Sequence, residues 1–151
     1  MTQMQDFFTR QKANDGVRFP LALPDGTATE HWLLVAGLDS DRYRALKAEQ
    51  DRALLMQMRE AGADDSKKEA VRAAADDAYL DRISILVTGW SFEQPCTPEN
   101  VREFLQNAPH IRDAIDAVVS DRSLFYKLAS KSSTPTPPQS SSSTNETANQ
   151  S

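Results

Sequence analysis

Cysteine and histidine are scarce: Cys96, His31 and His110 are the only ones among 151 residues. One cysteine cannot close a disulfide within the chain, so we expect a reducing compartment and a small, half-buried apolar role for Cys96. These three side chains match no metal-ligand spacing, and the chain lacks the glycine-rich, HExxH and GxSxG motifs of nucleotide and hydrolase sites. The acidic pairs Asp64-Asp65 and Asp76-Asp77 are adjacent in sequence and so do not share a helix face. The sequence therefore predicts no enzyme, no cofactor and no metal.

Long apolar runs and a basic charge balance are missing as well. No stretch approaches the roughly 20 apolar residues that span a bilayer, and the N-terminus, MTQMQDFFTR, has no apolar signal region. We therefore expect neither a membrane segment nor export. The 22 acidic residues outnumber the 17 basic ones, giving a net charge of −5. Because nucleic-acid affinity comes mainly from Lys and Arg at phosphates, this balance argues against a nucleic-acid partner.

The first patterned stretch predicts a β-hairpin. Residues 17–23 begin with apolar/polar alternation and contain Pro20, which is typical of an edge strand. Pro24-Asp25-Gly26 is a strong turn signal, and residues 29–36 form a second extended run. In this run we expect Trp32 to pack inward, with a role as an interface anchor as the alternative. Two strands alone are marginal in water, so the hairpin must lie on helices or extend another sheet. An exposed edge can also pair with another chain.

The residues before the hairpin, 1–16, are polar apart from Phe7 and Phe8. They predict an N-terminal arm. The arm is either a loose terminus whose Phe pair tucks against the domain or a segment that orders on a partner, and the base rate for termini favours the former.

Two long helices should follow. Residues 41–61 carry a thin apolar stripe, begin after capping residues and end before Gly62. Residues 66–88 form a second helix with an alanine-rich first half, which permits close approach to the first. The short loop between them predicts an antiparallel pair. Residues 89–96 read as a connector holding two aromatic side chains.

The remaining pattern predicts three short helices and a tail. Thr97-Pro98-Glu99 is a helix start, Pro109 opens the next helix, and Asp121 can cap the last. From residue 131 onward the chain is rich in Ser, Thr and Pro and has no large apolar residue, so we expect disorder. The fold class is α+β, mostly α: an N-terminal β-hairpin packed on an antiparallel helix pair, then short C-terminal helices. The organisation is an arm (1–16), a single domain (17–130) and a disordered tail (131–151).

The order and spacing of three stretches resemble the tail assembly chaperones of long-tailed bacteriophages, the family that includes the lambda-type minor tail assembly protein. The first is LPDGTATEHWLLVAGLDSDRYRALKAEQ, residues 23–50. The second is LVTGWSFEQPCTPENVREFLQNAPHIRDAIDAVV, residues 86–119, and the third is DRSLFYKLASKSS, residues 121–133. Together they cover most of residues 17–133.

The resemblance implies a non-enzymatic protein of the infected host cytoplasm that is absent from the mature virion. It implies binding to the tape measure protein, which the chaperone keeps soluble, and recruitment of tail tube subunits. In this family a ribosomal frameshift near the end of the gene often yields a C-terminally extended product that contacts the tube subunits. Residues 129–131 are where such a product would diverge.

A long helical partner exposing an apolar stripe needs an apolar groove. Candidate groove residues are Trp90, Phe92, Phe104, Ile111 and Ile115, and Glu93, Glu99 and Glu103 are candidates for its rim. Ordinary core packing is the alternative role for each apolar residue, since aromatic and aliphatic side chains at helical spacing are mostly core.

A different class of function also stays open. A generic α+β adaptor or regulatory subunit would self-associate through the hairpin edge and the two long helices.

Overall fold

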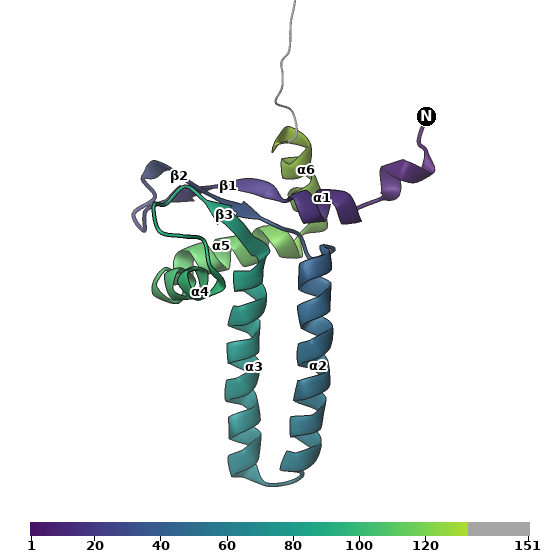
Figure 1. Ribbon diagram of the computed structural model, residues 1–151, viewed down its shortest axis with the longest axis vertical. Helices are drawn as coiled ribbons and strands as arrows, with labels where there is room; N and C mark the ends of the chain where they lie inside the picture. The colour runs from purple at the N-terminus through teal and green to yellow at the C-terminus, as the bar shows by residue number, and fades with distance from the viewer. Residues whose placement is uncertain (133–151) are drawn as a thin grey trace, which may run out of the picture.

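The computed structural model describes residues 1–132 of the chain (Figure 1). A three-stranded sheet and three short helices form a body, and two long helices project from it. We call this pair of long helices the arm; it is distinct from the N-terminal segment of residues 1–16. The prediction of a mostly helical α+β protein is confirmed. The predicted disordered tail lies outside the described residues, apart from its first two positions, which end the last helix.

The sheet has the order β1-β2-β3 and is antiparallel throughout. β1 (Val17–Ala22) and β2 (Ala28–Val35) form the predicted hairpin, and Gly26 turns the chain with a φ of 92°. Pro20 lies on the edge strand, where its missing N–H leaves no gap in the ladder.

Trp32 does not pack inward as expected. Leu33 and Val35 point into the core at 0% and 1% exposure, so the alternation of a strand places Trp32 on the other face. It pairs there with Pro20 and lies half-buried under the Arg18 guanidinium, whose Cζ is 4.1 Å from the indole centroid. The tryptophan is therefore covered by a cation rather than by the core.

The arm consists of α2 (Asp41–Ala61) and α3 (Asp65–Leu86). The Ser40 hydroxyl caps α2 by accepting a hydrogen bond from the Tyr43 N–H at 3.4 Å. The Asp64 carboxylate caps α3 by accepting hydrogen bonds from the first-turn N–H groups. Of α2 only Ala61 is buried, and the buried residues of α3 all lie in its last two turns, next to the sheet. The arm is thus held at its base and touches little else.

The end of α3 corrects a prediction. The helix was expected to run through Thr88 into a connector, but it ends at Leu86, and Val87–Trp90 form β3. β3 pairs with β2, with Leu33 opposite Trp90 and Leu34 opposite Gly89. The physical reason is the free edge of β2, whose backbone groups gain partners when Val87 leaves the helical conformation.

Three helices complete the body: α4 (Pro98–Asn107), α5 (Pro109–Ser120) and α6 (Arg122–Ser132). α4 and α5 lie below the sheet and beside the base of the arm, whereas α6 rises along β1 (Figure 1). The sheet meets the arm only at that base, where the Ala36 N–H donates to the Leu86 carbonyl at 2.7 Å. The largest fully buried residues are Phe125, Leu33, Leu86, Leu105, Ile115, Val17, Val35 and Val101.

The N-terminal segment contains a 3₁₀ turn, η1 (Met4–Phe7), and a short helix, α1 (Arg10–Asp15). α1 is tied to the arm because the Arg10 guanidinium donates two hydrogen bonds to the Asp41 carboxylate, at 2.8 and 2.9 Å. The expectation that Phe7 and Phe8 tuck against the domain is wrong: they are 74% and 56% exposed. The segment before α1 projects away from the body (Figure 1).

Candidate partner-binding site

Three aromatic side chains from two separate elements meet at the surface of the body. Trp90 ends β3, Phe92 follows it, and Phe104 comes from α4. The ring centroids of Trp90 and Phe92 are 5.2 Å apart, those of Phe92 and Phe104 are 5.2 Å apart, and those of Trp90 and Phe104 are 5.9 Å apart. These are the distances of mutually packed rings. All three side chains are half-buried, so each keeps part of its surface open to solvent.

Hydrogen bonds fix the loop that carries Phe92. The Trp90 indole N–H donates to the Gln94 carbonyl at 2.7 Å and so folds the loop back on itself. On the other side, the Ser91 hydroxyl accepts a hydrogen bond from the Trp32 N–H at 2.9 Å and lies 3.0 Å from the His31 ring. These contacts continue the β2–β3 pairing past the last strand residue. They hold the Phe92 ring against His31, with centroids 4.7 Å apart.

The helix that carries Phe104 is fixed at its N-terminus by the last residues of the preceding loop. The Thr97 hydroxyl accepts a hydrogen bond from the Asn100 N–H at 3.1 Å, as a cap does. The Asn100 side chain in turn donates to the Pro95 carbonyl at 2.9 Å. Arg102, on the same helix, donates to Asp77 and Asp81 on α3. α4 is therefore bound to the base of the arm, and Phe104 is presented on a rigid element.

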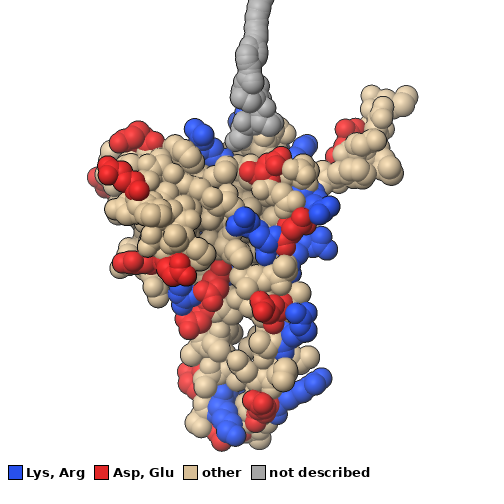
Figure 2. Space-filling view, viewed as in Figure 1, with Lys and Arg blue, Asp and Glu red and all other residues tan. Residues whose placement is uncertain are grey.

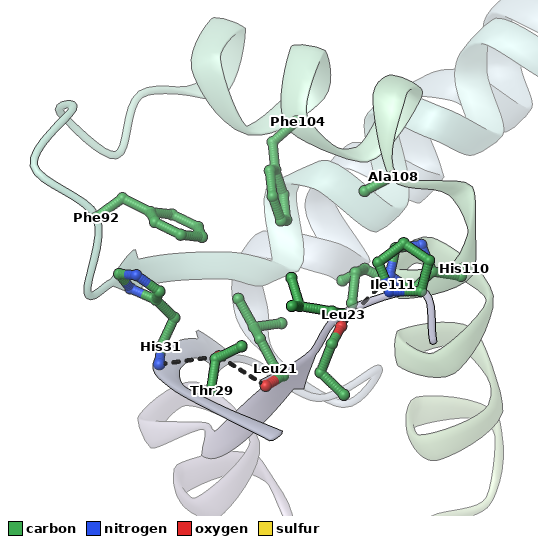
Figure 3. A pocket seen from close by; sticks show the side chains of 11 residues that line it. Leu21, Leu23, Thr29, His31, Phe92, Phe104, Ala108, His110 and Ile111 are labelled. Atoms are coloured by element: carbon green, nitrogen blue, oxygen red, sulfur yellow. Dashed lines mark hydrogen bonds between the residues drawn. The ribbon is translucent and has the colours of Figure 1, made fainter. Parts of the chain in front are cut away.

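Phe92 and Phe104 form one wall of a pocket of about 200 Å³. Figure 3 shows the rings together with Leu21 of β1 and Leu23, which directly follows that strand, around the same space. Ile111, at the start of α5, closes the pocket at 5% exposure. The volume suits one large apolar side chain, because a 150 Å³ apolar cavity already holds a benzene ring.

A second, more open hollow of about 360 Å³ lies across the same two phenylalanines. Trp90 lines it together with the polar side chains of Gln94, Asn100, Glu103 and Asn107. Phe92 and Phe104 therefore form a ridge between an apolar pocket and a hollow with a polar border. We call the ridge and the two hollows the aromatic groove.

Three carboxylates stand close to the aromatic groove along the chain: Glu103 lines the open hollow, Glu93 directly follows Phe92, and Glu99 lies one helical turn before Glu103 on α4. Glu93, Glu99 and Glu103 are exposed, and none of them forms an ion pair within residues 1–132. The cation of α4, Arg102, points instead to the arm, where it pairs with two aspartates. We call these three carboxylates the glutamate rim. They leave an uncompensated negative charge beside an apolar surface.

The five residues that the sequence suggested for a groove lie at three depths. Trp90, Phe92 and Phe104 meet at the surface, and Ile111 borders the apolar pocket. Ile115 is 0% exposed and packs in the core, so it takes no part in the surface.

Sequence reasoning missed the part of the lining that the hairpin supplies: Leu21 and Leu23, and His31, which packs beside Phe92. The one signal for it was Leu23, an apolar residue directly before a turn.

The side chains that line the aromatic groove are mainly apolar on one side of the ridge and polar on the other. Burial raises the pKa of the Cys96 thiol, which disfavours the nucleophilic thiolate. Residues 1–132 contain no cluster of His, Cys, Asp and Glu that would hold a metal ion. In the same part of the chain, no helix combines the length and the apolar character that a bilayer crossing requires.

Comparison with known proteins gives one result. A family model described as phage tail assembly chaperone matches residues 4–122, which is most of the chain. The match takes in the hairpin, the arm and the whole aromatic groove. No curated protein and no solved structure matches.

Proposed function

This chain belongs to the phage tail assembly chaperone family, and we propose that it acts in tail assembly by holding an apolar stripe of the tape measure protein in its aromatic groove. In this proposal it works in the host cytoplasm, keeps the long helical tape measure protein soluble until tube subunits replace it, and is absent from the mature virion. The observation that carries the proposal is the half-buried aromatic ridge with an apolar hollow on one side and a polar-bordered one on the other.

The groove is suited to a helix. Apolar side chains at i and i+3 or i+4 lie about 5–6 Å apart on one helix face, so two of them can straddle the ridge formed by Phe92 and Phe104. Helix-in-groove recognition uses anchors with this spacing. The glutamate rim would then favour helices that carry Lys or Arg beside their apolar stripe.

The expected affinity of one groove is modest. Burying two large apolar side chains contributes about 3–6 kcal/mol, whereas association costs at least about 4 kcal/mol in lost motion. Weak contacts repeated along a long partner hold it collectively and still exchange one at a time. A chaperone that must be displaced by tube subunits benefits from such a balance.

Recruitment of tail tube subunits belongs to the same proposal, through a C-terminally extended frameshift product. Residues 129–131, where such a product would diverge, lie in the last turns of α6. α6 packs along β1, on the body rather than on the arm. An extension from this helix would therefore start beside the sheet.

The test is co-expression with the tape measure protein of the same phage. We expect the tape measure protein to become soluble and to co-purify with this chain. Phe104→Ala should abolish both effects while the circular dichroism spectrum stays that of a folded protein. Leu124→Ala is the matched control, because Leu124 is also apolar and 40% exposed but lies on α6. A tape measure protein that stays insoluble and does not co-purify with the wild-type chain refutes the proposal.

The adaptor hypothesis makes the opposite forecast. A generic self-associating adaptor would form stable oligomers and show no affinity for tape measure segments. One observation favours the self-association part of it: the outer surface of the arm carries exposed apolar residues.

A further inference from the structure

The far half of the arm exposes apolar side chains that nothing in the described chain covers. Leu55 is 50%, Met56 61% and Met58 55% exposed, all on α2. Figure 2 shows charged groups of both signs along the arm with uncharged surface between them. Exposed Leu and Met on a projecting helix indicate a contact surface, since methionine adapts its shape to a partner and packs well against aromatic rings.

Two of these residues belong to a stripe flanked by positive charge. Arg52, Leu55, Met56 and Arg59 stand at i, i+3, i+4 and i+7 and so share one face of α2. Neither arginine forms an ion pair or a hydrogen bond within residues 1–132. Glu60, an acidic neighbour, lines the hollow between the two helices together with Lys67 rather than the stripe. We call Arg52, Leu55, Met56 and Arg59 the arm stripe.

The arm stripe and the aromatic groove complement each other. The stripe offers an apolar centre between two unpaired cations, and the groove offers an apolar centre beside the unpaired glutamate rim. The thioether of Met56 also finds aromatic rings in the groove, where sulfur–ring contacts are favourable. Apolar matching and charge matching therefore point to the same pairing.

The pairing cannot form within one chain. Leu55 lies fourteen residues beyond the first residue of α2, which places it about 21 Å along a straight helix from the body. The arm extends away from the sheet and from the loop between β3 and α4 (Figure 1), and its two helices pack against each other. A stripe that cannot bend back to its own groove can reach only the groove of another molecule.

We propose that the arm stripe of one copy docks in the aromatic groove of a second copy. The copies cover each other's groove in the absence of a client, and a client helix displaces the arm when it binds. The second part rests on the proposed function, since it requires the same groove to hold the tape measure protein. The first part, self-association through stripe and groove, stands without it.

The first test is sedimentation of the full chain over a range of concentrations, without any partner. We expect association at roughly 100 µM chain, because a pair of copies that cover each other's groove forms two apolar contacts but loses its free motion only once. Leu55→Gln together with Met56→Gln should raise the dissociation constant by at least about tenfold, because two apolar side chains lose their burial. Met4→Gln is the matched control: it removes a methionine that is 69% exposed but lies in the N-terminal segment. A monomeric wild type, or a double variant that associates like the wild type, overturns the proposal.

The second test uses two charge-reversed chains. One carries Arg52→Glu and Arg59→Glu in the stripe, and the other carries Glu93→Lys and Glu103→Lys in the rim; Glu99 is left alone because it supports the N-terminus of α4. Each chain alone presents like charges at the contact and should be monomeric. Their mixture restores opposite charges at both contacts and should associate. A mixture that stays monomeric, while both chains are folded by circular dichroism, contradicts the pairing.

Client capture separates this proposal from the proposed function. Stripe variants should capture the tape measure protein as well as or better than the wild type, since their grooves are no longer covered. If the wild-type chain captures the tape measure protein but does not self-associate, the contact between arm stripe and groove is refuted and the proposed function is retained. If the chain self-associates through the arm stripe but does not capture the tape measure protein, the proposed function is refuted and the contact is retained.

Discussion

Gly37→Ala should destabilise the protein although the backbone at this position does not require glycine. Gly37 joins β2 to α2, and its φ lies outside the left-handed region. A methyl group there would lie 2.9 Å from both Cε1 and Cζ of Phe125 and 3.2 Å from Cβ of Ala13. Carbon atoms prefer separations of about 3.5–4.0 Å. Neither neighbour can retreat, because Phe125 is 2% and Ala13 0% exposed.

Two opposing effects set the magnitude. Forcing a methyl group into a filled core typically costs about 1–3 kcal/mol. Replacing glycine by alanine where the backbone permits it returns about 0.4–1 kcal/mol by restricting the unfolded chain. We therefore expect a net loss of roughly 1–2 kcal/mol in the free energy of unfolding, and a Tm lowered by about 3–8 °C.

The assay is urea denaturation followed by circular dichroism, with Gly89→Ala as the control. A methyl group on Gly89 would meet Leu34 at 3.7 Å, an ordinary contact, so this variant should stay within about 0.5 kcal/mol of the wild type. Gly37→Ala should cost less in a Phe125→Leu background, with a coupling free energy of at least about 0.5 kcal/mol. A neutral or stabilising Gly37→Ala would refute the reasoning, as would a loss unchanged by Phe125→Leu.

Three further predictions concern a helix cap, a half-buried carboxyl and the C-terminal residues. Thr97→Ala removes the cap of α4 and should cost about 1 kcal/mol of unfolding free energy in urea titrations; a neutral result would mean that the cap is not used. Hydrogen bonds from Arg122 and Tyr126 hold the pKa of the Asp39 carboxyl well below its usual range, so the stability they give is present at neutral pH and lost as pH falls below about 4. Asp39→Asn should therefore cost about 1–2 kcal/mol at pH 7, and this cost should shrink progressively as the pH is lowered below about 4; a cost that stays the same down to about pH 2 would contradict this assignment. A chain lacking residues 133–151 should unfold with an unchanged midpoint, because their composition offers almost no apolar surface to bury.

Local signals located the elements well. The Ser40 and Asp41 start and the Gly62 stop give the bounds of α2, and the Pro24–Gly26 turn gives the hairpin. Both kinds of boundary depend on backbone groups that a capping or turn residue satisfies within a few positions. Such signals are complete in the sequence itself.

β3 and the part of the groove lining that the hairpin supplies were not predictable in this way. The apolar run ending in Leu86 and Val87 suits a helix and a strand equally, and the choice is made by the free edge of a strand some fifty residues earlier. Ile111 and Ile115 occupy the same helix face, yet one borders the surface pocket and the other is sealed. Periodicity predicts which face of a helix a side chain lies on, but not whether other elements cover that side chain completely.

The way in which the two long helices join the body lets the arm act as a lever. α3 runs into β3 without an intervening residue. Beside that junction, the hydrogen bond from the Ala36 N–H to the Leu86 carbonyl joins the segment before α2 to the end of α3. A helix of 21 residues is about 32 Å long, so a sideways pull at its free end acts as a torque on the short strand at its base. Trp90 sits at the end of that strand, four residues past the pivot. A force on the tip of the arm is therefore transmitted to the side chain of Trp90.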